Sequence, residues 1–452
     1  MIERTVLNSL REWSKKQNRK PLVIRGARQV GKTTIVEIFA KEFDTFLALN
    51  LDREAERDLF DLYQSAGEVL TAIHLLKNEP KKDGRTLLFI DEIQSSPKAV
   101  ALLRYFYEDM PELYVIAAGS LLETMIDRQI SFPVGRVEYL ALRPCSFGEF
   151  LNAMGEFQLQ NALQTVSLPA PIHAHAMKLF NEYVLVGGMP EAVAFYAKTK
   201  DLVALRDVYE TLLNSYRDDM EKYASDTTIK NVLRHILMYG WQYAGQRIKF
   251  ERFANSNYKS REMGEAFRIL EKAMLLELTY PVVNTSLPLL PDLKKSPKLM
   301  WLDTGLVNYS AKLQQELFGT QDISEAWKGK IAEHIVGQCL LSASDLVSEK
   351  RNFWVREARN SQAEVDFVFP YKGQLVPVEV KSGDNSKLKS LHLFMEKSTG
   401  TFAIRFWNQA VSLDEIKLPS GKKYTLYNLP FYYSGYIEKV LELKNGRTIN
   451  HL

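Results

Sequence analysis

Apolar and polar positions along the first third of this chain alternate in a way that predicts a mixed α/β fold. Short apolar runs are separated by amphipathic stretches, among them residues 33–43 and 97–109. The apolar runs are residues 21–24, 45–50, 86–90 and 114–118. Strands that alternate with helices of this length are typical of a parallel sheet with helices on both faces. We therefore expect a parallel α/β core between residues 20 and 150.

The next segment has a helical pattern. Residues 151–220 are mostly helical, with an interruption at residues 187–190. Two further helical patterns, at residues 227–239 and 260–276, flank a short segment at 248–253, which favours a helix-turn-helix or winged-helix module. Residues 281–297 contain four prolines, too many for a regular element, so we place the main domain boundary there.

A second α/β pattern follows this boundary. It predicts one helix and several strands, at residues 325–341, 352–356, 364–370, 375–381 and 400–407. At the other end of the chain, Ile2, Val6, Leu10 and Trp13 recur at helical spacing among charged residues. This spacing predicts an amphipathic helix rather than a signal peptide, which would need an uninterrupted apolar run.

Composition narrows the class of protein. A chain of 452 residues with 46% hydrophobic and 25% charged residues is of ordinary globular type, and its length predicts about three domains. The net charge of +3 gives no sign of a protein that coats nucleic acid. Cys145 and Cys339 lie outside any zinc or redox spacing, so we expect buried thiols. No apolar stretch is long enough for a membrane span, so we expect no membrane partner and a cytoplasmic location.

Residues 26–33 read GARQVGKT and fit the pattern G-x-x-x-x-G-K-[ST] directly between a predicted strand and a predicted helix. Such a loop surrounds phosphate with backbone N–H groups, and the helix N-terminus adds partial positive charge. Lys32 is expected to contact the β- and γ-phosphates, and the Thr33 hydroxyl to bind Mg²⁺. The predicted nucleotide-binding residues are Gly26, Ala27, Arg28, Gln29, Val30, Gly31, Lys32, Thr33 and Thr34.

Two other strand ends agree with a nucleotide site. The apolar run at residues 86–90 ends in Asp91 and Glu92, and ligands gather at the carboxyl ends of parallel strands. We therefore predict that Asp91 holds Mg²⁺ indirectly and that Glu92 is the general base for the attacking water. Ser120, after the next strand, is a candidate contact to the γ-phosphate, although Ser after Gly is also ordinary turn chemistry.

An arginine from a neighbouring subunit or domain would stabilise charge in the transition state. Arg136 is our candidate for this arginine finger, with Arg128 and Arg143 as competitors. The alternative role for Arg136 is a surface ion pair.

Several motifs together resemble a bacterial and archaeal group of AAA+ class ATPases: GARQVGKTT, LLFIDEIQ, AAGSLLE, VGRVEYLALRPCSFGEF and GGMPEAV. Residues 298–306, KLMWLDTGL, resemble the marker of the C-terminal domain of unknown function in that group. The resemblance implies an AAA+ fold with a helical lid, a winged-helix segment and ATP as ligand. It also implies that Pro190, in a G-x-P turn of the lid, packs on the adenine.

A second candidate site lies near the C-terminus. Residues 364–369 and 376–381 alternate in strand fashion and are joined by a short connection that contains Gly373, as in a hairpin. Residues two apart share a face of a strand, so the hairpin would bring Asp366 beside Glu379 and Lys381. Two carboxylates and a lysine on one face favour a chemical site. A simple ion pair among the three is the competing interpretation.

This layout resembles the PD-(D/E)XK nuclease-like group, and Glu333 on the preceding predicted helix resembles the additional acidic residue of many members. The resemblance implies that Asp366 and Glu379 hold Mg²⁺ and that Glu333 assists. It implies that Lys381 orients the attacking water or stabilises the developing phosphate charge.

The predicted architecture has four parts: an AAA+ core at residues 1–165, a helical lid and linker at 166–225, a winged-helix-like module at 226–297, and a restriction-endonuclease-like α/β domain at 298–452. We predict an ATPase whose nucleotide cycle is coupled to the nuclease-like domain, with ATP and Mg²⁺ as ligands. DNA or RNA, a second copy of the chain, and a protein are the candidate partners. The alternatives are an ATP-dependent protein-interaction switch with a non-catalytic C-terminal domain, and a regulator that only binds nucleic acid.

Overall fold

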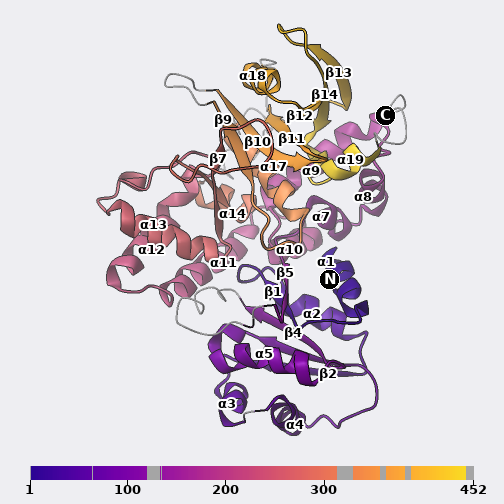
Figure 1. Ribbon diagram of the computed structural model, residues 1–452, viewed down its shortest axis with the longest axis vertical. Coiled ribbons are helices and arrows are strands. Elements are labelled where there is room, and N and C mark those ends of the chain that lie inside the picture. Colours follow the sequence, from indigo (N-terminus) through magenta and orange to yellow (C-terminus); the bar gives the residue numbers. More distant parts are fainter. Residues whose placement is uncertain are drawn as a thin grey trace.

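The computed structural model describes residues 2–63, 65–119, 133, 135–312, 329–356, 363–381 and 388–443. A sheet near the N-terminus and a larger sheet near the C-terminus lie at opposite ends of the molecule, and helices occupy the region between them (Figure 1). In the described part of the chain, no helix is both long and apolar enough to cross a membrane. Cys145 and Cys339 are buried free thiols, as expected.

The N-terminal sheet has the strand order β2-β3-β4-β1-β5, and all of its pairings are parallel. Its strands are β1 (Leu22–Arg25), β2 (Thr45–Asn50), β3 (Thr86–Asp91), β4 (Tyr114–Gly119) and β5 (Glu138–Ala141). Leu22 and Ile24 belong to one apolar core and Val23 to another, so the sheet is covered on both faces. The expected parallel core is confirmed. The edge strand β5 was not predicted, because it begins with half-buried Glu138 and exposed Tyr139 and so carries no continuous apolar run.

Local sequence explains where the helices around this sheet begin. The helices are α1 (Val6–Lys15), α2 (Lys32–Ala40), α3 (Glu54–Leu62), α4 (Ala66–Lys77) and α5 (Pro97–Asp109). The Ser96 side chain caps α5 by accepting from the Ala99 N–H, and proline follows at the first helical position. Ser65 and Glu68 form a capping box at the start of α4.

A mostly helical region follows. It contains α7 (Phe147–Ala153), α8 (Phe157–Gln164), α9 (His173–Val186), α10 (Pro190–Thr199), α11 (Leu205–Glu221), α12 (Thr227–Tyr239) and α13 (Ser260–Lys272). The antiparallel strands β6 (Leu276–Thr279) and β8 (Lys298–Trp301) come next in a two-stranded sheet. The helix predicted to reach residue 276 ends at Lys272, because the chain turns at Met274, where φ is +57°, and then enters β6.

The C-terminal half is built on a mixed sheet with the order β13-β14-β12-β11-β10-β9-β7. Its elements are β7 (Pro281–Val282), α14 (Thr304–Ser310), α17 (Lys330–Ser342), β9 (Asn352–Val355), β10 (Glu364–Tyr371), β11 (Gln374–Val380), α18 (Lys389–Lys397), β12 (Phe402–Trp407), β13 (Ser412–Lys417), β14 (Lys423–Pro430) and α19 (Ile437–Leu443). The predicted hairpin is present: Tyr371 pairs with Gln374 across Lys372 and Gly373, which both have positive φ.

The predicted boundary at residue 297 lies between two strands that pair with each other. β6 precedes it, β8 follows it, and β7, which also precedes it, joins the C-terminal sheet through β9. The chain therefore crosses between modules more than once near residues 276–301. The four domain limits stay a prediction.

A buried carboxylate links the turn after α9 to the C-terminal half. Asp303 is fully buried; its Oδ2 accepts the Gly188 N–H at 2.5 Å, and its Oδ1 accepts the Leu306 N–H at 3.1 Å. Gln338 of α17 also donates to Oδ2, at 3.3 Å. A Cβ on Gly187 would lie 2.3 Å from Asp303 Oδ1, so this turn requires glycine. Burial raises the pKa of Asp303 to about 6.

His334 of α17 belongs to the same buried network. Its Nε2 accepts the Trp301 N–H at 3.0 Å, and its Nδ1 lies 3.2 Å from the Thr304 hydroxyl. An Nε2 atom that accepts a hydrogen bond must be unprotonated, so the ring is neutral. Burial, assisted by the charge of Arg351, lowers the pKa of His334 to about 3.

This shift predicts how stability depends on pH. The pKa of a histidine in the unfolded chain is about 6.5. Below that pH, His334 therefore binds a proton in the unfolded chain but stays neutral in the folded chain. His334 should therefore remove about 2 kcal/mol of the free energy of unfolding between pH 7 and pH 5. Glutamine in His334→Gln can still accept the Trp301 N–H and does not titrate. Between pH 7 and pH 5 the free energy of unfolding of this variant should therefore fall by about 2 kcal/mol less than that of the wild type.

Urea unfolding at the two pH values measures the difference. His74→Gln, at a half-buried position of α4 outside this network, is the control and should keep the wild-type pH dependence. Equal losses in His334→Gln and wild type would contradict the assignment.

Candidate functional site

The loop between β1 and α2 has the curled backbone that a phosphate site needs. Gln29 and Gly31 both have positive φ, +63° and +94°. A Cβ on Gly26 would lie 2.4 Å from the Leu142 carbonyl oxygen, so only glycine fits there. Lys32 is 7% exposed, and its Nζ donates to the carbonyl oxygens of Gly26 and Ala27, both at 2.9 Å. The lysine is thus enclosed by its own loop.

Thr33 and Asp91, the two residues predicted to serve Mg²⁺, lie in contact. The Thr33 hydroxyl donates to Asp91 Oδ2 at 2.6 Å, and Asp91 ends β3. Asp91 Oδ1 accepts the Glu92 N–H at 3.0 Å. A hydroxyl and a carboxylate are hard oxygen donors, so these two residues fit Mg²⁺.

Glu92 directly follows β3 in an unusual conformation. Its φ is +52°, and its Oε2 accepts a hydrogen bond from Gln94 Nε2. Burial raises the pKa of Glu92. Burial also lowers the pKa of Lys32. The negative charges of Glu92 and Asp91 reduce this effect, because they favour the protonated lysine. A strained glutamate beside a buried lysine is an arrangement found at functional sites.

Contacts from distant parts of the sequence hold the loop in place, and sequence reasoning missed them. Arg28 forms an ion pair with Asp219 of α11, and the Tyr216 hydroxyl of the same helix donates to the Arg28 carbonyl at 3.1 Å. Arg4 donates to the Val30 carbonyl at 3.1 Å and pairs with buried Glu149 at 3.0 Å. These partners are far apart in sequence, so no local motif could have identified them.

The structure describes only some of the remaining residues that were predicted to contact the nucleotide. Pro190 begins α10 beside the loop: a Cβ on Gly31 would lie 3.8 Å from its Cγ. Ser120 and Arg128 lie outside the described residues. Arg136 is 43% exposed and bonds Glu108 of α5 at 2.8 Å, which raises its pKa. Its role as an arginine finger stays a prediction, as do the adenine contact of Pro190 and the γ-phosphate contact of Ser120.

The predicted C-terminal cluster comes together on the β10–β11 hairpin. Phe367 pairs with Val378, and Asp366 Oδ2 accepts the Val380 N–H at 2.7 Å. Lys381 Nζ lies 2.6 Å from Glu379 Oε1, so these two side chains share a face. Among the described residues, the buried Glu379 Oε2 has no hydrogen-bond partner. Such an orphaned carboxylate oxygen fits a ligand or an ion.

Two further charged residues, Lys298 and Glu364, complete this cluster and were not predicted as site residues. Lys298 of β8 is 1% exposed, forms an ion pair with Glu333 and lies 2.7 Å from Glu364 Oε1. The signal in the sequence was a lysine beside the apolar run LMW, because a buried lysine must be paired.

The electrostatics of the cluster follow from burial and crowding. Burial raises the pKa of Glu333 to about 8 and, together with repulsion from Asp366, that of Glu379 to about 7. Burial acts to lower the pKa of Lys298, but Glu333, Glu364 and Asp366 outweigh it and raise that pKa. Within the described ranges, no three His, Cys, Asp or Glu side chains are arranged to hold a metal ion. The Mg²⁺ roles of Glu333, Asp366 and Glu379 stay a prediction.

Comparison with protein families supports an ATPase-type core. Residues 18–151 match an AAA domain, residues 177–317 a domain of unknown function (DUF8612), and residues 328–421 another domain of unknown function (DUF4143). The first match covers the sheet β1–β5 and the phosphate-binding loop, and it supports ATP binding and hydrolysis there. No curated protein matches the chain.

Two solved structures are similar over part of the chain. A Walker-type ATPase of Pyrococcus abyssi is 14% identical, with 69% of this chain and 96% of that chain covered and a TM-score of 0.43. PCH-2 of C. elegans is 11% identical, with 44% and 62% covered and a TM-score of 0.28.

The ion pairs of Lys298 generate a stability prediction. Lys298→Met leaves Glu333, which is mostly buried, and Glu364, which is half-buried, without their cation, and breaking a buried pair in this way costs about 3–5 kcal/mol. Urea unfolding should show a loss of that size. Adding Glu333→Gln should recover part of it, because a carboxyl group that has lost its cation is replaced by a neutral amide.

Lys249→Met is the control, since Lys249 is exposed in the same module. Its effect should stay within about 0.5 kcal/mol. A Lys298→Met loss as small as that of the control would show that the cluster does not need the lysine.

Proposed function

We propose that this protein binds and hydrolyses ATP at residues 26–34. The observation that carries the proposal is the 2.6 Å contact between the Thr33 hydroxyl and Asp91, next to buried Lys32 in a glycine-dependent loop. A loop of N–H groups at a helix N-terminus, a lysine and an oxygen pair are the parts that phosphoryl transfer uses. The AAA domain match over residues 18–151 supports the same function.

Each residue then has a role. Lys32 exchanges its carbonyl partners for the β- and γ-phosphates of ATP. Thr33 and Asp91 would hold Mg²⁺, which neutralises phosphate charge. Glu92 takes the proton of the attacking water, and its raised pKa favours this role. Ser120 contacts the γ-phosphate, Pro190 packs on the adenine, and Arg136 acts from a neighbouring copy of the chain.

We further infer that ATP turnover is coupled to a nuclease-like C-terminal domain that acts on DNA or RNA. The order helix α17, strands β9–β11, helix α18 and parallel strand β12 supports an endonuclease-like fold, and α12, α13, β6 and β8 support a winged helix. Asp366, Glu379 and Glu333 would hold Mg²⁺, which activates water and stabilises phosphate charge. Lys381 positions the water. The Asp303 network connects this domain to the turn beside the nucleotide loop.

One observation favours a second candidate function, an ATP-dependent protein-interaction switch whose C-terminal domain is not catalytic. Lys298 is buried against Glu333 and Glu364 and supplies the positive charge that a metal would otherwise supply. A cluster neutralised in this way can be purely structural.

ATP hydrolysis by the purified chain tests the first site. Lys32→Ala should abolish nucleotide binding, because the phosphates lose their cation. Glu92→Gln should keep binding but lower turnover by about 100-fold or more, because the general base is lost. Phosphate release and binding of a fluorescent ATP analogue measure the two effects. Lys41→Ala, exposed just beyond α2, is the control; unchanged turnover in both site variants would contradict the assignment.

Nuclease activity requires a separate assay. Cutting of branched, nicked and single-stranded DNA and RNA in Mg²⁺ or Mn²⁺ should disappear in Asp366→Ala and in Lys381→Ala. It should persist in Asp83→Ala, which changes an exposed carboxylate far from the cluster in sequence. If the wild type neither cuts nor binds any of these substrates, the protein-interaction switch is the better account.

A further inference from the structure

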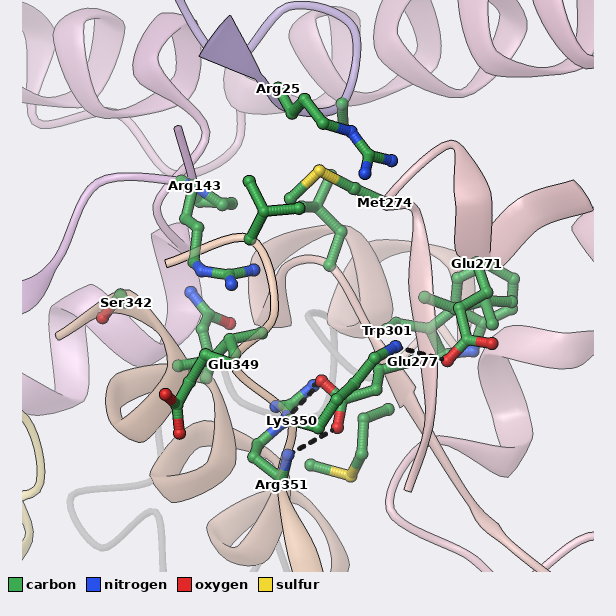
Figure 2. A pocket seen from close by; sticks show the side chains of 18 of the residues that line it. Arg25, Arg143, Glu271, Met274, Glu277, Trp301, Ser342, Glu349, Lys350 and Arg351 are labelled. Carbon is green, nitrogen blue, oxygen red and sulfur yellow. Dashed lines mark hydrogen bonds and ion pairs between the residues drawn. The ribbon is translucent and has the colours of Figure 1, made fainter. Parts of the chain in front are cut away.

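A cavity of about 310 Å³ lies where the nucleotide-binding core, the α13–β6–β8 module and the C-terminal half meet. Arg25 and Ala27 line it from the core, Arg143 from the segment after β5, Met274 from the turn after α13, and Glu349 from the loop before β9. Figure 2 shows Arg25, Arg143, Met274 and Glu349 around a common space. Ala27 is also a predicted nucleotide-binding residue and Arg143 a competing arginine-finger candidate, but the cavity itself has no role assigned above.

Some charges of the cavity wall are already neutralised. Arg351 pairs with Glu277 at 3.1 Å, and Lys350 pairs with Glu271 at 2.9 Å. The dashed lines in Figure 2 mark these contacts. Both pairs belong to the wall and leave no net charge of their own.

Arg143 differs from these paired residues. Its guanidinium donates to the carbonyl oxygens of Ser344, at 3.4 Å, and Leu346, at 3.0 Å, and in the described part of the chain it has no carboxylate within ion-pair distance. Burial, followed by repulsion from Arg351, lowers its pKa to about 10. Arg143 is half-buried, and carbonyl contacts leave its charge without a carboxylate among the described residues, so an anion in the cavity would give it a favourable partner.

The other charged groups favour an anion as that partner. Arg268 also lines the cavity and adds positive charge. Glu349 is the remaining carboxylate of the lining, and burial raises its pKa. Cationic groups therefore outnumber carboxylates once the two wall pairs are set aside.

Apart from Lys272, Gln338 and Ser342, the rest of the lining is apolar. It consists of Ala27, Leu142, Pro144, Met274, Leu276, Met300, Trp301, Leu302, Leu341 and Val347. Apolar walls with a few directed polar groups are typical of small-molecule sites, and this volume lies at the lower end of their range.

We propose that the cavity binds a small organic anion, with an apolar or aromatic body against Met274 and Trp301 and a phosphate or carboxylate group on Arg143. The ligand would contact three parts of the chain at once. Ala27 belongs to the nucleotide-binding loop, and the Leu142 carbonyl lies against Gly26 of that loop. The site is therefore separate from the ATP site but adjoins it.

The test uses 1-naphthyl phosphate as the probe and isothermal titration calorimetry on the full chain, with saturating ADP present to fill the nucleotide loop. The wild type should bind the probe, and uncharged 1-naphthol should bind at least tenfold more weakly. Arg143→Gln should weaken probe binding about tenfold or more, because a charge-assisted hydrogen bond is lost. Glu349→Gln should tighten probe binding severalfold, because it removes a carboxylate that repels the phosphate group.

The control is Arg104→Gln, an exposed arginine of α5 paired with Glu108, which should bind like the wild type. Tighter binding by Glu349→Gln cannot result from misfolding, so it separates binding from a structural effect. Any of three results would overturn the proposal: no binding by the wild type at 1 mM probe (roughly the weakest useful affinity), wild-type affinity in both cavity variants, or binding of 1-naphthol as tight as that of the phosphate.

Discussion

The buried carboxylate of Asp303 is the interaction on which the arrangement of the modules depends. It binds the backbone of the turn before α10 and caps α14, and it receives a hydrogen bond from α17. Because Pro190, which follows that turn, lies beside the nucleotide-binding loop, one side chain sets the spacing between the loop and the C-terminal half. A buried acceptor with several N–H partners permits little displacement, since each lost bond would leave a buried polar group unpaired.

Charge in this protein is organised locally. The net charge of +3 conceals a buried cluster in which Lys298 and Lys381 face several carboxylates, and a separate cavity where arginine predominates. Lys298 comes from β8 of the module with α12 and α13 and ends among residues of the C-terminal half. The proposed nuclease site and the proposed anion site therefore both depend on contacts between modules. A change in the packing of β8 would therefore alter both the proposed nuclease site and the proposed anion site.

Much of the fold could be predicted from the sequence. Strands β1–β4 of the first sheet, α5, α12 and the β10–β11 hairpin lie where the pattern placed them, because strand and helix periodicity and turn residues act over a few positions. Strands β5, β13 and β14 were not predicted; β5 and β13 are edge strands with exposed positions, which carry a weak pattern. The predicted helix that overran into β6 failed because pairing with β8 outweighed local helical preference.

For the candidate site, the sequence by itself determined the phosphate-binding loop, the Thr33 and Asp91 pair, and the shared face of Asp366, Glu379 and Lys381. These depend on short spacings along strands and turns. Only the tertiary structure decided that Lys298 enters the acidic cluster, that Asp219 and Arg4 hold the loop, and that Arg143 faces a cavity. Each of these brings together residues distant in sequence. A local sequence pattern does not predict such a contact, because the contact forms only when helices and strands from distant parts of the chain pack against one another.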